Sequence, residues 1–247
     1  MRKLFVIGIG AGDPDQVTVQ AIKAMRQVET FFVIGKGETK HGLVAVRTAI
    51  LDQHMDRPYR IVSITDPPRD RTPADYVDTV AGWHDRRSAV LESAFAGVTG
   101  VGGILVWGDP ALYDSTLRMI QRVLDRRAMH FDYEVIPGVT SAQALAARHR
   151  VVLHGVGEPV HVTTGRRLRA EGLGAHSTVV MLDGECSFTA ISGDDVHIWW
   201  GAYLGMPDET LIEGPLPAVC DQIVRRRAEL RDRNGWIMDI YLLRRRG

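Results

Sequence analysis

Residues 4–14 read LFVIGIGAGDP, and this stretch is the strongest indication of the fold. Its apolar half is typical of a buried parallel strand, and its glycines allow a tight turn and a close approach of a ligand to the backbone. The turn departs from the dinucleotide-binding fingerprint, because that fingerprint requires glycine at the position of Asp13. Asp13 and Pro14 also put a carboxylate and a missing N–H where a pyrophosphate needs donors. The stretch therefore predicts a strand followed by a ligand-binding turn of another kind, or by a turn that is only structural.

Strand and helix patterns alternate from this first strand to residue 136. Short apolar runs predict strands at residues 4–9, 31–34, 59–64, 104–107 and 131–136. Apolar residues at helical spacing predict helices at residues 18–28, 43–53, 74–96 and 117–124. Because strands that alternate with helices form parallel sheets, we expect a parallel α/β sheet in this half of the chain.

The second half of the chain alternates less regularly. It predicts strands at residues 160–163, 178–182, 197–202 and 236–243, and helices at residues 140–147 and 216–230. A larger share of strands favours a mixed sheet. We therefore expect two α/β domains, residues 1–137 with a parallel sheet and residues 138–247 with a mixed sheet.

Composition narrows the class of protein further. The chain has 247 residues, 45% of them hydrophobic, and its 30 basic residues balance its 30 acidic ones. This composition can form a core, and the neutral balance argues against a nucleic-acid-binding protein. No apolar run approaches the roughly 18 residues needed to span a bilayer. Cys186 and Cys220 have no metal-site spacing, so we expect free thiols, no bound metal and a cytoplasmic protein.

Two further loops follow predicted strands. Residues 104–115 read ILVWGDPALYDS, and residues 134–142 read EVIPGVTSA. The carboxyl ends of parallel strands are where open α/β sheets bind ligands. Asp109 can cap the next helix or face a ligand. The hydroxyls of Thr140 and Ser141 can likewise cap a helix or bind a ligand.

Two Gly-Asp-Pro turns and one Pro-Gly-Val-Thr-Ser turn thus occur in this order, each at a strand end. Together they resemble the tetrapyrrole (corrin/uroporphyrinogen) methyltransferase family, which uses S-adenosylmethionine. The resemblance covers nearly the whole chain and is strongest at residues 5–18, 104–115 and 134–145. It implies that family's two-domain fold with the cofactor in the interdomain cleft, S-adenosylhomocysteine as the product, no metal, and a homodimer.

The resemblance also implies a set of cofactor-binding residues. These are Gly10, Trp107, Gly108, Asp109, Leu112, Thr140, Ser141, Leu182, Asp183, Gly201 and Ala202. The chain departs from the family pattern in two places. Ala11 stands where many members have proline, and residues 199–203 replace a commoner segment that holds a charged pair and a threonine.

Residues 182–188 (LDGECSF) and 33–37 (VIGKG) resemble one branch of this family. The branch methylates ring carbon C-1 of precorrin-5 and releases a two-carbon acyl group as acetate. Methyl transfer needs alignment of the reactants and no covalent enzyme intermediate. Acyl release needs attack of water on a carbonyl, which a base assists. The candidates for this catalysis are Glu185, Asp109 and Tyr113, with Glu185 first because it lies in the branch-specific stretch.

A precorrin carries many carboxylates, which arginine binds in bidentate fashion. We expect Asp13, Arg166 and Arg167 at the substrate, with Arg169 nearby in the sequence. Arg69 and Arg71, in a proline-rich stretch, are candidates for contacts from a lid. The densest basic runs, residues 225–227 and 244–246, are expected on a solvated helix face and a solvated tail.

Three other functions stay open at this point. They are a methylase that acts at another ring position, a NAD(P)-dependent oxidoreductase with a degenerate fingerprint, and a non-catalytic tetrapyrrole binder. Asp13 counts against the oxidoreductase, and so does Glu29, because it precedes the second predicted strand instead of ending it. A thermal shift with S-adenosylhomocysteine and none with NADH would exclude that alternative.

Overall fold

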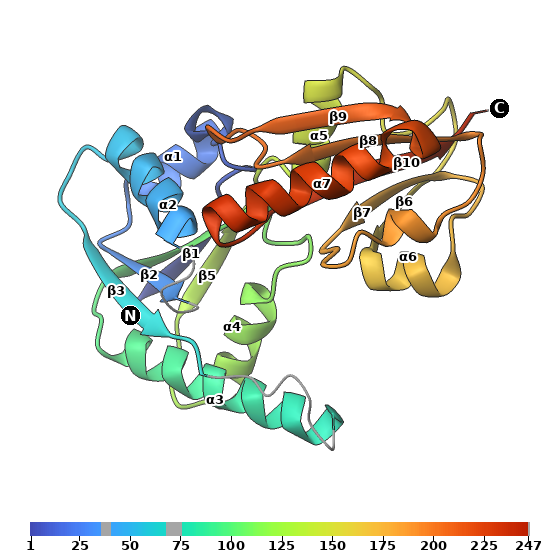
Figure 1. Ribbon diagram of the computed structural model, residues 1–247. Helices are drawn as coiled ribbons and strands as arrows, with labels where there is room; N and C mark the ends of the chain where they lie inside the picture. The colour runs from blue at the N-terminus through green and yellow to red at the C-terminus, as the bar shows by residue number, and fades with distance from the viewer. Residues whose placement is uncertain (36–40, 68–75, 247) are drawn as a thin grey trace. The chain divides into compact units, whose positions relative to one another are not determined.

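The computed structural model describes residues 1–35, 41–67 and 76–246. Close contacts divide the chain into two compact units, which Figure 1 shows. The first unit is Met1–Gly10 with Pro14–Val139, and the second is Ala11–Asp13 with Thr140–Gly247. Arg69 and Arg71 lie outside the described residues. No helix in the described ranges combines the length and the apolar character needed to cross a membrane.

The first unit is built on a parallel sheet of five strands. The strands are β1 (Lys3–Gly8), β2 (Thr30–Gly35), β3 (Arg60–Thr65), β4 (Val101–Val106) and β5 (Asp132–Ile136), in the order β3-β2-β4-β1-β5. Each neighbouring pair is parallel. Helices α1 (Val19–Met25) and α2 (His41–His54) cover one face, and α3 (Tyr76–Ala96) and α4 (Thr116–Asp125) cover the other (Figure 1). The parallel α/β sheet predicted for this half is confirmed.

Alternate residues of β1 explain its unbroken apolar run. Phe5 and Ile7 belong to the core under α1 and α2, whereas Leu4 and Val6 belong to the core under α3 and α4. Because successive side chains of a strand point to opposite faces, a strand covered on both faces must be apolar throughout. The same rule accounts for β4, whose six residues are all buried.

The prediction that β4 begins only at residue 104 is wrong, because Gly102 and Gly103 lie inside the strand. Large neighbours occupy the space that side chains at these positions would fill. A Cβ on Gly102 would lie 2.8 Å from Phe32 Cε2, and a Cβ on Gly103 would lie 2.8 Å from Val28 Cγ2. Glycine therefore serves packing here and does not interrupt the strand.

The second unit is built on a mixed sheet, as predicted. Its strands are β6 (Val160–Thr164), β7 (Ser177–Met181), β8 (Val196–Ala202), β9 (Thr210–Pro215) and β10 (Asp239–Arg245), in the order β6-β7-β10-β8-β9. β6 and β7 are parallel, and the other neighbouring pairs are antiparallel. Helix α5 (Ser141–His149) packs on one face, and α6 (Gly165–Glu171) and α7 (Leu216–Asn234) pack on the other (Figure 1).

Sequence patterns missed β9 and α6. β9 is an edge strand of alternating half-buried and exposed residues that ends in Gly214 and Pro215, which are signals of a turn. α6 has only seven residues, and Leu168 is its one buried apolar side chain, so it carries no helical periodicity. Arg166 and Arg167, which the sequence left in a loop, therefore lie on a helix.

His197 is a buried histidine of the second sheet, 6% exposed. Its ring lies 4.2 Å from that of Trp199, and its Nδ1 accepts a hydrogen bond from Arg246. Burial, followed by the positive charge of Arg246, lowers the pKa of His197 below its usual 6.5. Of the other groups that face it, Arg244 and His149 act in the same direction, and Glu213 opposes them.

A lowered pKa makes the stability of this unit depend on pH. The folded state binds fewer protons at His197 than the unfolded state does. Above the unfolded pKa of 6.5, His197 is neutral in both states and does not change the free energy of unfolding. As the pH falls below 6.5, protonation of the unfolded state lowers that free energy progressively. We expect the wild type to lose more unfolding free energy than His197→Gln between about pH 7.5 and pH 5.5. Urea titrations at both pH values measure the difference. Equal losses in the two proteins would contradict the prediction.

Candidate functional site

The three loops that the sequence singled out follow adjacent strands of the first sheet. β1 lies between β4 and β5, and all three run in parallel, so their carboxyl ends share one edge. Gly108 N–H donates to the Gly10 carbonyl at 2.8 Å, and Gly10 N–H donates back at 3.4 Å. The loops after β1 and β4 are therefore joined through their backbones.

Glycines let these loops approach each other closely. A Cβ on Gly138 would lie 2.2 Å from the carbonyl oxygen of Gly108 and 2.8 Å from the carbonyl carbon of Gly8. A Cβ on Gly8 would lie 2.6 Å from Gly138 N. Gly10 and Gly108 also have φ angles of 80° and 66°, which side chains rarely permit. Glycine at these positions is thus required for the loops to meet.

Asp109 holds two of the loops together. Its Oδ1 accepts a hydrogen bond from Ala111 N at 2.7 Å, and its Oδ2 accepts one from Gly138 N at 3.0 Å. Both carboxylate oxygens thus bind backbone amides, one in the loop after β4 and one in the loop after β5. This geometry makes Asp109 an organiser of the strand-end edge.

The remainder of the loop after β4 offers other groups to a ligand. The indole N–H of Trp107 is buried and has no hydrogen-bond partner within the described part of the chain. An unpaired buried donor is costly, and an acceptor on a ligand would satisfy it. Leu112 closes the turn by donating its N–H to the Asp109 carbonyl at 3.2 Å. Tyr113 follows with a φ of 51° and a side chain that is 41% exposed.

An ion pair that the sequence does not predict adjoins this loop. Arg87 of α3 pairs with Asp66 at 2.6 Å, and the two side chains are 7% and 8% exposed. Arg87 also donates to Ser115 Oγ at 3.3 Å, just before α4. A single arginine within a long helix carries no sequence signal of this role, because its partners lie 21 and 28 residues away.

Thr140 and Ser141 begin α5 in the second unit. Thr140 forms a capping box, in which its Oγ1 accepts from Gln143 N at 3.3 Å and Gln143 Oε1 accepts from Thr140 N at 2.8 Å. The Thr140 side chain is thus used by the helix. Ser141 is half-buried, and no hydrogen bond to its hydroxyl is seen among the described residues.

Ala11, Gly12 and Asp13 pack with the second unit. Ala11 is 4% exposed within the core beneath α5, where a small side chain fits. A Cβ on Gly12 would lie 2.6 Å from the Leu204 carbonyl oxygen, and a Cβ on Gly205 would lie 2.6 Å from Asp13 N. The first glycine-rich turn therefore meets the turn after β8.

Gly201 and Ala202 end β8 and are both buried. A Cβ on Gly201 would lie 2.8 Å from Leu145 Cδ1 and 2.8 Å from Leu204 Cδ2. The small size of Gly201 therefore has a packing reason, and contact with a ligand here would involve the backbone.

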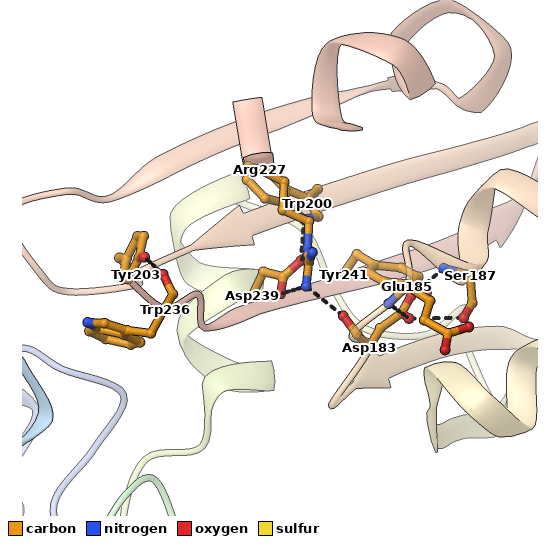
Figure 2. A network of polar contacts seen from close by, with 9 residues as sticks. All are labelled: Asp183, Glu185, Ser187, Trp200, Tyr203, Arg227, Trp236, Asp239 and Tyr241. Carbon is orange, nitrogen blue, oxygen red and sulfur yellow. Dashed lines mark hydrogen bonds and ion pairs between the residues drawn. The ribbon is translucent and has the colours of Figure 1, made fainter. Parts of the chain in front are cut away.

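The two residues after β7 differ sharply in exposure. Leu182 is 67% exposed and has a φ of 53°, whereas Asp183 is 6% exposed. The Asp183 carboxylate accepts hydrogen bonds from Ser187 N (2.6 Å), Tyr241 OH (2.7 Å), Ser187 Oγ (2.9 Å) and Glu185 N (3.1 Å), most of which Figure 2 shows. The protein itself thus uses the Asp183 side chain, whereas the Leu182 side chain is exposed.

The pKa shifts of Asp183 and Tyr241 agree with these hydrogen bonds. Burial acts to raise the pKa of Asp183, but the hydrogen bonds from Tyr241, Glu185 and Ser187 outweigh it and lower the pKa below its usual value. Burial and the neighbouring Asp183 raise the pKa of Tyr241. Asp183 is therefore held as a carboxylate and Tyr241 as a neutral donor.

The basic run 225–227 is only partly the solvated helix face that the sequence predicted, because Arg227 is buried. Arg227 lies on the inner side of α7 and pairs with Asp239 of β10 at 2.8 Å, and the two side chains are 7% and 6% exposed. Burial acts to lower the pKa of Arg227, but hydrogen bonding to Asp239 outweighs it and the pKa is raised. Consecutive residues of a helix lie about 100° apart, so three arginines in a row span about 200° and one of them can point inward.

The run 244–246 is also only partly a solvated tail. Arg244 donates to Ser177 Oγ at 2.8 Å and to the Val152 carbonyl at 2.6 Å, and it lies over the ring of Trp199. Arg245 is exposed and pairs with Asp195. The prediction overlooked that β10 extends to Arg245, which places Arg244 within a strand.

The other charged candidates lie on the surface of the second unit. Glu185 is 72% exposed and forms an ion pair with Arg169 of α6. Arg167 pairs with Glu171 at 2.5 Å on the same helix, and Arg166 is exposed. Among the described residues, no three His, Cys, Asp or Glu side chains are grouped so that they could hold a metal ion.

Comparisons with known proteins agree with this fold. Residues 3–220 match the family model of the tetrapyrrole (corrin/porphyrin) methylases. The chain is 44% identical to a precorrin-6A synthase [deacetylating] from Sinorhizobium sp over 99% of this chain and 96% of that protein.

Solved structures give the same result. A cobalamin synthesis related protein (CobF) from Corynebacterium diphtheriae is 36% identical, with a TM-score of 0.87 over 99% of both chains. A uroporphyrin-III C-methyltransferase from Thermus thermophilus, solved with S-adenosylhomocysteine, shares the fold at 17% identity, with a TM-score of 0.63 over 98% of this chain and 92% of that one. On this evidence, the chain belongs to the tetrapyrrole (corrin/porphyrin) methylase family.

Proposed function

We propose that this protein is an S-adenosylmethionine-dependent methyltransferase of cobalamin biosynthesis, which methylates C-1 of precorrin-5 and releases the acyl group as acetate to give precorrin-6A. The observation that carries the proposal is 44% identity to a precorrin-6A synthase [deacetylating] along 99% of the chain. The proposal includes a homodimer in the cytoplasm.

The residues at both sets of strand ends suit the cofactor. In the first unit, the backbones of Gly10 and Gly108 bind each other at the strand ends, and the Trp107 indole N–H is a buried donor without a protein partner among the described residues. In the second unit, Leu182 is an exposed apolar side chain and Ser141 is a half-buried hydroxyl. The proposed set is completed by Leu112, Thr140, Gly201 and Ala202. When bound, S-adenosylmethionine supplies an activated methyl group on its sulfonium.

Methyl transfer places few chemical demands on the protein. The chain's task is to hold two reactants in line, and such orientation can supply roughly 7–11 kcal/mol. Asp109 serves this task by binding the loops after β4 and β5 to each other. Arg166 and Arg167, exposed on α6, are the proposed partners of the substrate carboxylates. Asp13 is the third residue proposed at the substrate.

Acyl release requires a base, and we assign this role to Glu185. Both oxygens of Asp109 already accept backbone hydrogen bonds, whereas the Glu185 side chain is 72% exposed. Tyr113, 41% exposed, is the proposed donor beside the leaving group. Loss of a general base typically lowers the rate by about 10²–10⁴-fold, so Glu185→Gln should release acetate that much more slowly. Glu171→Gln is the matched control, because Glu171 is also an exposed partner of an α6 arginine.

Incubation of the protein with precorrin-5 and S-adenosylmethionine tests the proposal. We expect S-adenosylhomocysteine, a methyl group on C-1 and one acetate for each turnover. Methylation without acetate would overturn the deacetylating activity and leave the family intact. Methylation of a different carbon would assign the chain to another ring position, and binding of precorrin-5 without turnover would indicate a non-catalytic binder.

A further inference from the structure

The turn that follows β7 has an unfavourable backbone conformation. Leu182 and Cys186 have φ angles of 53° and 52°, a left-handed region that residues with side chains rarely occupy. Leu182 is 67% exposed, whereas the next residue, Asp183, is 6% exposed. Such a conformation persists only where surrounding interactions hold it in place.

Buried hydrogen bonds hold this turn from inside. The Asp183 carboxylate binds two backbone amides of the turn, those of Glu185 and Ser187, at 3.1 Å and 2.6 Å. Tyr241 of β10 donates its hydroxyl to the same carboxylate at 2.7 Å. The turn is thus fastened to the central strand of the second sheet.

A second layer fastens the backbone of the turn. Arg227 of α7 donates through Nη2 to the Asp183 carbonyl at 2.8 Å and pairs through Nε with Asp239 at 2.8 Å. Trp200 of β8 donates its indole N–H to Asp239 at 3.0 Å. Figure 2 shows that these side chains form one continuous chain of contacts from α7 to the turn. We call these six residues the Asp183 network: Asp183, Ser187, Trp200, Arg227, Asp239 and Tyr241.

A buried ion pair is a poor way to stabilise a fold, because apolar residues of similar volume often do as well or better. What an ion pair with directed hydrogen bonds does supply is a fixed geometry. In this network, the hydrogen bonds fix the backbone of residues 182–187. That place is also the strand end at which the proposed function puts a cofactor contact.

We propose that the Asp183 network is a positioning device that fixes the turn of residues 182–187 in the conformation that binds the adenosine part of S-adenosylmethionine. Its six residues act through Leu182 and the turn backbone and touch no reactant themselves. This inference rests on the proposed function.

The test is a conservative removal of one hydroxyl from the network. Tyr241→Phe keeps the aromatic ring and deletes the donor to Asp183. The dissociation constant for S-adenosylhomocysteine, measured by calorimetry, should rise about tenfold, as expected for the loss of one hydrogen bond to a charged group. The turnover number for methyl transfer at saturating cofactor should stay within about twofold of wild type, because no group that takes part in that step has changed. Methyl transfer is measured here instead of acetate release, because Glu185 lies in the turn itself. Ser187→Ala, which deletes a second donor, should shift the binding constant in the same direction.

Tyr203→Phe is the matched control. Tyr203 is another buried tyrosine of this unit, and its hydroxyl donates to the Trp236 carbonyl, away from the turn (Figure 2). It should lower the melting temperature much as Tyr241→Phe does and leave the dissociation constant within about twofold of wild type. A network that served stability alone would give the two variants the same binding constant, and that result would overturn the proposal.

Two outcomes separate this inference from the function on which it rests. Wild-type protein that binds no S-adenosylhomocysteine overturns the proposed function and this inference together. Wild-type protein that binds it, with Tyr241→Phe and Ser187→Ala binding equally well, overturns only the positioning role. Faster hydrogen exchange at the Glu185 and Ser187 amides in folded Tyr241→Phe is expected as a readout independent of turnover.

Discussion

Gly138→Ala is expected to destabilise the first unit by about 3 kcal/mol or more and to abolish binding of S-adenosylhomocysteine. The added Cβ would lie 2.2 Å from the Gly108 carbonyl oxygen and 2.8 Å from the Gly8 carbonyl carbon. Both neighbours are backbone atoms at the ends of central strands, so neither can move without disturbing the sheet. The shift would also break the bond from Gly138 N to Asp109. Urea unfolding and calorimetric titration measure the two effects.

Gly97→Ala is the control for this substitution. Gly97 belongs to the same unit, and a Cβ there would have its nearest neighbour, the Ala94 carbonyl oxygen, at 3.7 Å, an ordinary contact. Its unfolding free energy should stay within about 0.5 kcal/mol of wild type, with binding unchanged. Similar losses in the two variants would show that the crowding at Gly138 is not what limits substitution.

Arg227→Met is expected to cost about 3–5 kcal/mol of unfolding free energy, because it leaves the buried Asp239 without its cation. The Asp183 carbonyl would lose its donor as well. The two side chains of the pair are 7% and 6% exposed, so water cannot take over the role of the guanidinium. Urea unfolding near neutral pH measures the loss.

Arg226→Met provides the comparison. Arg226 precedes Arg227 on the same helix and forms an exposed ion pair with Glu229. Exposed pairs contribute about 0–1 kcal/mol, so this variant should be nearly neutral. The double variant Arg227→Met with Asp239→Leu should recover much of the loss, because it removes the stranded charge. An Arg227→Met variant as stable as Arg226→Met would contradict the role of the buried pair.

Much of the fold could be predicted because burial leaves a local pattern. The unbroken apolar runs at residues 4–7 and 104–106 predict strands covered on both faces, and these residues lie in β1 and β4. β9 and α6 could not be predicted in this way. One is an edge strand and the other buries a single apolar side chain, so neither carries a periodic signal.

The candidate site was also predictable only where its signals are local. The three loops could be placed at strand ends from their glycines and prolines, which are local signals. The function of Asp109 could not, since its partner Gly138 is 29 residues away, and the sequence left capping and ligand binding equally open. Asp183 is a similar case, because its bond to Tyr241 spans 58 residues. Only the three-dimensional fold shows that the protein itself uses both carboxylates.

By itself, then, the sequence determined the class of the fold, the family resemblance and the loops that matter, because each of these depends on residues close together in the chain. The tertiary structure decided which side chains in those loops are used for architecture and which are exposed. Arg227 illustrates the difference: it lies in a run of three arginines that predicts a solvated face, yet it is buried against Asp239 and Asp183. The reason is physical, since a charge can be buried only where a partner from a distant segment meets it, and no local pattern records that meeting.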